Sequence, residues 1–131
     1  MSPRRVLLRG KAHCIEAAML VAAVLWLHGE KPLLMDLRAH EKDEDHIIAL
    51  FKRCGHWGAI SKTNHVVLRY RDPVYKNPRE LALSYFNEYF LDNGKKSLRS
   101  YSRPVNLARF GHDWVTSDED LWYIANALEA A

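Results

Sequence analysis

The sequence predicts a small α+β domain in which an N-terminal helix that carries a cysteine packs on a small antiparallel sheet, with further helices after the sheet. An apolar stretch over residues 10–26, rich in Ala and Leu and without charge after Glu16, is typical of a buried helix. Short apolar segments separated by turn residues predict antiparallel strands. Capped segments nearer the C-terminus predict the later helices.

Length and composition fit one domain. The chain has 131 residues, of which 48% are hydrophobic and 27% charged. We expect a single domain over residues 1–131, made of an arm at 1–9, a core at 10–109 and an acidic helix at 110–131. The arm is basic and we expect it to be irregular or an edge strand.

The central part of the sequence predicts a meander. Residues 47–53 form a continuous apolar run, which is typical of a central strand. Pro32 stands at the start of the preceding strand, where no ladder donor is needed. We expect strands at 31–39, 47–53, 57–61 and 65–71, with turns at 54–56 and 62–64 and a loop at 72–77.

Helix signals follow the meander. Asn77 is a predicted N-cap and Pro78 the first residue of a helix that ends near residue 90. Its predicted apolar face consists of Leu81, Tyr85, Phe86, Tyr89 and Phe90. Residues 95–103 predict a loop with one short extended piece. Residues 116–120 predict the cap and acidic first turn of the last helix, with Leu121, Ile124 and Leu128 on its apolar face.

The cysteine count and the hydropathy of the sequence predict a reducing compartment and no membrane span. The two cysteines, Cys14 and Cys54, are too few for a disulfide scaffold, so we expect free thiols in a reducing compartment. The apolar run of residues 15–27 is shorter than the ~20 residues of a bilayer span. No apolar leader or small-residue cleavage site follows the first arginines. We therefore expect a soluble, cytoplasmic protein with no membrane partner.

The sequence order of three residues carries the functional prediction. Cys14 stands in the first turn of the predicted helix, where unpaired backbone N–H groups and the helix dipole favour a thiolate. His46 begins a strand, and Trp57 opens the next one. Taken alone, Cys14 also fits a small core residue and His46 a solvated strand end.

In this order and context, residues 10–65 resemble the transglutaminase-like branch of the papain-like cysteine enzymes. The resemblance implies that Cys14 attacks an acyl carbon, His46 is its general base, and the residue at position 61 orients the imidazole. That family usually has an aspartate there, whereas this chain has Ser61. Serine accepts a hydrogen bond but lacks the carboxylate that stabilises imidazolium. The other candidate orienting residues are Asp43, Asn64 and Asp72.

An acyl-transfer site also needs donors for an oxyanion. The backbone N–H of Cys14 is the first candidate, and His13 or Trp57 is the second. We expect acyl transfer from, or hydrolysis of, a peptide or protein amide through a Cys14 thioester, without a cofactor or metal. The His13-Cys14 and Cys54-Gly55-His56 pairs lack the usual spacing of zinc ligands.

Two alternatives stay open. Residues 62–109 hold ten basic and four acidic residues, interleaved with tyrosines such as Tyr70, Tyr75 and Tyr101. Mixtures of cations and aromatics bind single-stranded nucleic acid, although the acidic C-terminal block can also neutralise this surface. The fold could instead serve as a catalytically inactive protein-binding or nucleic-acid-binding module. The sequence does not indicate an oligomeric state.

Overall fold

The computed structural model describes residues 1–41, 43–63, 66–91 and 93–131. Its α-helices are α1 (Pro3–Arg9), α2 (Cys14–Leu27), α3 (Pro78–Leu83) and α4 (Trp122–Ala130). Its strands are β1 (Leu33–Ala39), β2 (His46–Arg53), β3 (His56–Ile60), β4 (Tyr70–Tyr75), β5 (Leu98–Tyr101) and β6 (Val105–Asn106). Short 3-10 helices are η1 (Val66–Leu68), η2 (Phe86–Glu88), η3 (Leu107–Phe110) and η4 (Asp113–Val115). The predicted α+β class is confirmed.

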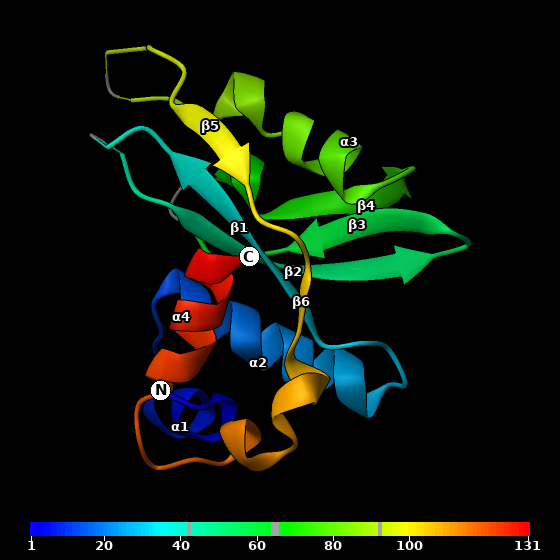
Figure 1. Ribbon diagram of the computed structural model, residues 1–131, viewed down its shortest axis with the longest axis vertical. Coiled ribbons are helices and arrows are strands. Elements are labelled where there is room, and N and C mark those ends of the chain that lie inside the picture. The colour runs from blue at the N-terminus through cyan, green and yellow to red at the C-terminus, as the bar shows by residue number, and fades with distance from the viewer. Residues whose placement is uncertain (42, 64–65, 92) are drawn as a thin grey trace.

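The strands form one antiparallel sheet in the order β4-β3-β2-β1-β5, and β6 also pairs with β1 (Figure 1). The predicted meander corresponds to β2, β3 and β4, which pair antiparallel in that order, and β1 also pairs antiparallel with β2. Six consecutive residues of β2, from His46 to Phe51, are buried. A strand covered on both faces needs such an apolar run, which is why the sequence indicated its central position.

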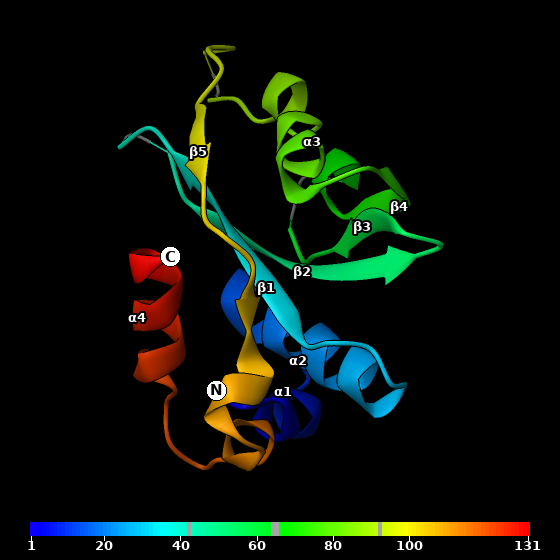
Figure 2. The ribbon, with the colours of Figure 1, turned by 45° about the vertical axis from the view of Figure 1, so that its right-hand side comes forward.

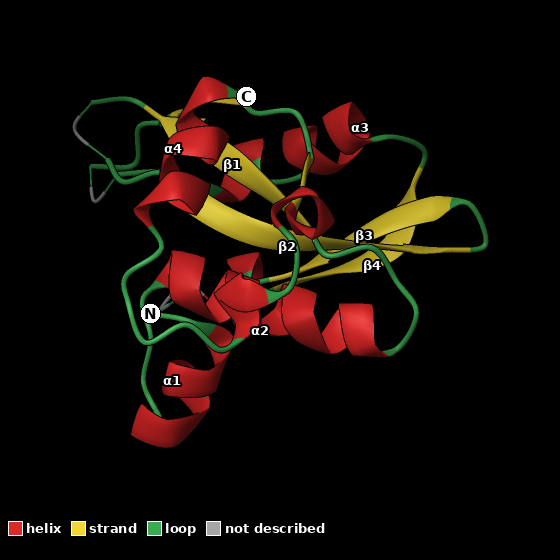
Figure 3. Ribbon diagram, turned by 60° about the horizontal axis from the view of Figure 1, so that its bottom comes forward, coloured by secondary structure: helices red, strands yellow, loops and turns green. Residues whose placement is uncertain are grey.

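Helices cover both faces of the sheet. Figures 1 and 2 show α3 on one side of the strands and α2 with α4 on the other, and Figure 3 sets the yellow strands apart from the red helices. On the α2 side, side chains such as Met19, Ala22 and Leu34 share a core with Trp114 and Ile124. The α3 side has a second core, which contains Met35, Leu37, Ile48, Leu50, Leu81, Tyr85 and Tyr89.

The N-terminal segment is a helix, so the predicted arm or edge strand was wrong. Ser2 Oγ accepts a hydrogen bond from the Arg5 N–H at 3.4 Å, and Pro3 takes the first helical position. Gly10, with a φ of 70°, ends this helix in the left-handed region. Consequently the second helix begins at Cys14 and not at Gly10, which leaves Cys14 at a helix N-terminus.

The fourth strand lies later in the chain than predicted. Residues 66–68 form η1, and the strand covers 70–75, which includes four of the six residues of the loop predicted at 72–77. Pro73 is tolerated there because β4 is an edge strand. Of the apolar residues at 66–68, Leu68 alone is buried. His65, at the start of the predicted strand, lies outside the described residues.

The helix predicted over 78–90 ends early, at Leu83. Its predicted cap is confirmed, because Asn77 Oδ1 accepts the Glu80 N–H at 2.8 Å. Arg71 Nη2 donates to the Ser84 carbonyl at 3.3 Å, which in a continuous helix would accept the N–H four residues on. Phe86 and Phe90 are therefore 40% and 50% exposed, and their predicted place on the buried face was wrong.

The last helix starts after its predicted cap. The Ser117 hydroxyl bonds the N–H and the carbonyl of Glu119 in a local turn, and α4 starts at Trp122. The predicted cap at 116–120 was wrong, whereas burial of Leu121, Ile124 and Leu128 is confirmed. Among the described residues, no single helix has the length and apolarity to cross a membrane, and α1 and α2 meet that criterion only as a pair bent by 111°.

A buried carboxylate on β1 gives a prediction about pH. Burial, reinforced by the charge of Asp45, raises the pKa of Asp36 to about 6 from an ordinary 3.8, although Arg38 opposes the shift at 3.5 Å. The folded protein therefore binds this proton more tightly than the unfolded chain does between about pH 4 and pH 6. The contribution of Asp36 to the free energy of unfolding falls as the pH rises through that window.

We expect Asp36→Asn to remove this dependence. The free energy of unfolding of the variant, relative to the native chain, should be higher at neutral pH than at about pH 5. Urea titrations at both pH values measure the difference. If the difference does not change with pH, Asp36 ionises alike in the folded and unfolded chains. The Arg38 side chain that contacts Asp36 also donates, through Nη2, to the carbonyls of Leu128 and Glu129 at the end of α4.

Candidate active site

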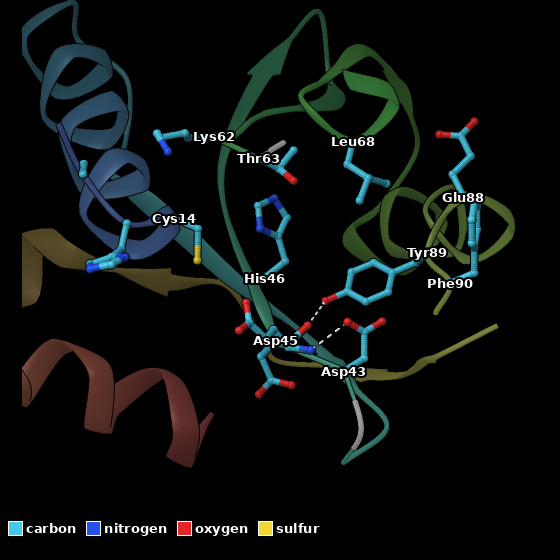
Figure 4. Close-up of a pocket in the computed structure, with 13 residues that line it drawn as sticks. Cys14, Asp43, Asp45, His46, Lys62, Thr63, Leu68, Glu88, Tyr89 and Phe90 are labelled. Carbon is cyan, nitrogen blue, oxygen red and sulfur yellow. Dashed lines mark hydrogen bonds between the residues drawn. The ribbon is translucent and has the colours of Figure 1, made fainter. Parts of the chain in front are cut away.

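A cavity of about 340 Å³ opens where the N-terminus of α2 meets the start of β2 (Figure 4). Both predicted reactive residues, Cys14 and His46, line it, although 32 positions separate them in the sequence. The remaining walls come from the loop before β2, the connection after β3, and residues 88–90 at the end of η2. The lining residues are Ala12, His13, Cys14, Asp43, Glu44, Asp45, His46, Lys62, Thr63, Leu68, Glu88, Tyr89 and Phe90.

Cys14 is the first residue of α2, and local hydrogen bonds fix the helix start there. The carboxylate of Glu16 accepts the N–H of His13 at 2.9 Å and contacts the Met1 ammonium at 2.5 Å. Burial opposes ionisation of Glu16, but these two donors outweigh it and lower its pKa. Because an N-terminal turn has no intrahelical acceptors for its first N–H groups, the backbone at Cys14 and Ile15 offers donors to an anion.

His46 is 8% exposed, and its imidazole contacts Ser61. The imidazole Nε2 lies 2.9 Å from Ser61 Oγ. The Ser61 hydroxyl in turn donates to the Leu68 carbonyl at 2.9 Å, so its oxygen accepts from the imidazole. With the Ser61 proton used on Leu68, this hydrogen bond favours the tautomer of neutral His46 that carries its hydrogen on Nε2 and a lone pair on Nδ1. Figure 4 shows the Cys14 and His46 side chains projecting into the same cavity.

This chain of hydrogen bonds predicts the effect of substitution at position 61. Ser61→Ala removes the acceptor for Nε2–H and should lower the ratio of the Nε2–H to the Nδ1–H tautomer about two- to tenfold, which corresponds to one hydrogen bond. Ser61→Thr keeps the hydroxyl and should keep the ratio. Long-range ¹H–¹⁵N spectra of His46 measure the ratio directly. An unchanged ratio in Ser61→Ala would show that another contact sets the tautomer.

The loop that precedes β2 is held by three separate segments. Tyr89 donates its hydroxyl to the Glu44 carbonyl, and Ser97 donates to the Asp43 carboxylate. Asp45 Oδ1 accepts the Ala39 N–H at 2.9 Å. Burial, followed by the charges of Asp43 and Asp45, raises the pKa of Tyr89, so its hydroxyl keeps its proton over the physiological range. These contacts hold the backbone that carries His46.

The other predicted site residues lie in different places. His13 and Asp43 line the cavity, and the Asp43 carboxylate bonds Ser97. Trp57 is at the far end of β3, where Lys52 lies 5.0 Å from its ring, and Asp72 is exposed on β4. Neither is among the cavity-lining residues. Asn64 lies outside the described residues.

Some cavity residues carry no functional signal in the sequence. Tyr89 fits the apolar pattern of a core helix, and η1, which supplies Leu68, was predicted as strand. Contacts between segments far apart in sequence bring these residues to the site. Among the described residues, no three His, Cys, Asp or Glu side chains form a metal-binding group, and both Cys14 and Cys54 are free thiols.

No protein-family model matches this sequence, and no curated protein matches it. The candidate site therefore rests on its own geometry: a thiol at a helix N-terminus and an oriented imidazole that share one cavity.

Proposed function

We propose that this protein is a transglutaminase-like cysteine enzyme that transfers an acyl group from, or hydrolyses, a peptide or protein amide. Cys14 is the nucleophile, His46 the general base and then acid, and Ser61 a positioning residue. One observation carries the proposal: a hydrogen-bonded chain runs from His46 Nε2 through Ser61 Oγ to the Leu68 carbonyl, and His46 and Leu68 line the cavity that Cys14 also lines. This chain favours the tautomer in which Nδ1 of His46 carries the lone pair, and we propose Nδ1 as the nitrogen that accepts the proton.

The proposed reaction has two halves. In the first, His46 Nδ1 takes the thiol proton while Cys14 Sγ bonds the amide carbon, whose π electrons move to oxygen. The N–H groups at the start of α2 stabilise that oxyanion. The C–N bond then breaks, the amine leaves with the proton from His46, and a Cys14 thioester remains.

In the second half, water or a primary amine attacks the thioester. His46 accepts a proton from the attacking group and returns it to the departing Cys14 thiolate. The product is an acid with water or a new amide with an amine. Because Ser61 brings no negative charge to the imidazolium, we expect slower turnover than a carboxylate partner would allow. The two free thiols suit a reducing compartment such as the cytoplasm.

Acylation by p-nitrophenyl acetate tests the proposal. We expect a burst of p-nitrophenolate and one acetyl group on Cys14, located by peptide mass spectrometry. Cys54 serves as an internal control, because it is an exposed thiol in the turn between β2 and β3. Cys14 should acquire the acetyl group at least about tenfold faster than Cys54.

Two variants sharpen the assignment. Cys14→Ser should lose the burst, whereas Cys54→Ser should keep it. Equal labelling of both cysteines in the native chain would contradict the enzyme proposal and favour the non-catalytic binding module. Adding methylamine to the acylated protein then shows, by the yield of N-methylacetamide, whether an amine competes with water for the thioester.

A further inference from the structure

A second, largely apolar groove of about 370 Å³ lies between β5 on one side and α3 with η2 on the other. Ala82, Leu83 and Phe86 form one wall, and Leu98 and Tyr101 form the other. Leu83 and Phe86 are 51% and 40% exposed, although both are apolar. Figures 1 and 2 show α3 and β5 flanking this region, on the α3 side of the sheet. The groove shares no lining residue with the Cys14 cavity.

The strand wall of the groove is a sheet edge. β5 ends the strand order and pairs with β1. The Ser102 N–H donates to the Asp36 carbonyl at 2.8 Å, and the next residue pair is Tyr101 with Leu37. Along an antiparallel strand, residues whose N–H and carbonyl groups bond the neighbouring strand alternate with residues whose groups point away from it. Since Ser102 bonds β1, the N–H and carbonyl of Tyr101 point away from β1. Such an edge can pair with one extended chain, whose alternate side chains reach an adjoining groove.

The positive charge along this edge indicates the charge of the chain that would pair with it. Residues 95–103 include Lys95, Lys96, Arg99 and Arg103 and no acidic residue. Arg99 Nη1 bonds the carbonyls of Lys96 and Leu98 at 2.9 Å and 3.2 Å, which holds its cation beside the strand. A second copy of β5 would bring like charges together, so edge-to-edge self-pairing is disfavoured. An acidic chain would meet opposite charge.

We propose that β5 and its groove bind an extended acidic peptide segment of a partner protein by strand addition. Apolar side chains at alternate positions of the segment enter the groove beside Leu83 and Phe86, and its carboxylates lie along the Lys and Arg side chains. Two of the seven lining residues, Phe86 and Tyr101, carry aromatic rings, which is fewer ring faces than a stacked single strand of nucleic acid uses, so the groove favours the peptide. The proposal does not depend on Cys14 chemistry.

Binding of a labelled peptide tests the proposal. The probe is a fluorescein-labelled decapeptide of alternating Glu and Val, measured by fluorescence anisotropy. Arg99→Glu should weaken binding about tenfold or more, because it brings like charges together, and Phe86→Ser should weaken it by loss of apolar contact. Arg9→Glu is the matched control, since it changes the net charge equally on α1 and should leave binding nearly unchanged.

Probe chemistry distinguishes the alternatives. A decapeptide of alternating Lys and Val should not bind, and a Pro replacement at the centre of the acidic peptide should weaken binding because it removes a ladder donor. Amide shifts at Ser100 and Tyr101 in ¹H–¹⁵N spectra should accompany binding. Equal loss in Arg9→Glu and Arg99→Glu would overturn the proposal in favour of general charge attraction. Tighter binding of oligo(dT), lost in Arg99→Glu, would overturn it in favour of nucleic acid.

Discussion

Replacing His46 with glutamine is expected to slow acylation of Cys14 by p-nitrophenyl acetate by about 10²–10⁴-fold, the usual contribution of a general base. The side-chain amide of the introduced glutamine can still donate to Ser61 Oγ, so the variant removes the basic nitrogen and keeps the hydrogen bond. Stopped-flow release of p-nitrophenolate measures the rate. Circular dichroism verifies that the variant is folded.

The matched control for this variant is His56→Gln. His56 is an exposed histidine in the hairpin between β2 and β3, where its Nδ1 lies 3.1 Å from the Cys54 carbonyl. Its replacement should leave the acylation rate within about twofold. If both glutamine variants react at the native rate, Cys14 acts without His46 and the catalytic pair does not exist.

Trp114→Ala is expected to lower the free energy of unfolding by about 3–5 kcal/mol, the range for truncation of a buried aromatic side chain. Trp114 is fully buried and stacks on Trp26, with ring centroids 5.7 Å apart and planes within 2°. Its Nε1–H donates to the Gly111 carbonyl at 3.0 Å. Truncation therefore leaves a cavity and removes both the stacking contact with Trp26 and the donor to the Gly111 carbonyl.

Trp122→Ala is the control, because Trp122 is 72% exposed at the start of α4. We expect it to change the free energy of unfolding by no more than about 0.5 kcal/mol. Urea unfolding followed by far-ultraviolet circular dichroism measures both variants independently of tryptophan fluorescence. Similar losses in the two variants would mean that the core around Trp114 collapses to fill the space.

Local signals predicted much of this fold. The apolar run of β2, the Asn77-Pro78 start of α3 and the apolar spacing of α4 all depend on nearby residues, and each was found where predicted. Two errors, the missed helix α1 and the late start of α4, also concern local contacts, whereas the early end of α3 involves a distant residue. Arg71 donates to the Ser84 carbonyl just after α3 ends, an interaction that no helical pattern contains.

Part of the candidate site could be predicted from the sequence and part could not. Sequence order indicated Cys14 and His46, and the structure brings both to one cavity. Their catalytic roles stay predictions. The hydrogen bond from Tyr89 to Glu44 could not be predicted, because it joins the loop before β2 to a segment 45 positions away that resembled the buried face of a helix.

The loop before β2, which leads into His46, also affects when the site forms during synthesis. Its contacts reach forward to Tyr89 and Ser97, so a chain that has just emerged through β3 has the thiol and the imidazole but not the segments that hold them. The hairpin of β2 and β3 forms quickly because its contacts are local. The site forms later, because its contacts to Tyr89 and Ser97 join residues far apart in sequence. During synthesis, the Cys14 cavity is therefore completed only after most of the chain has been translated.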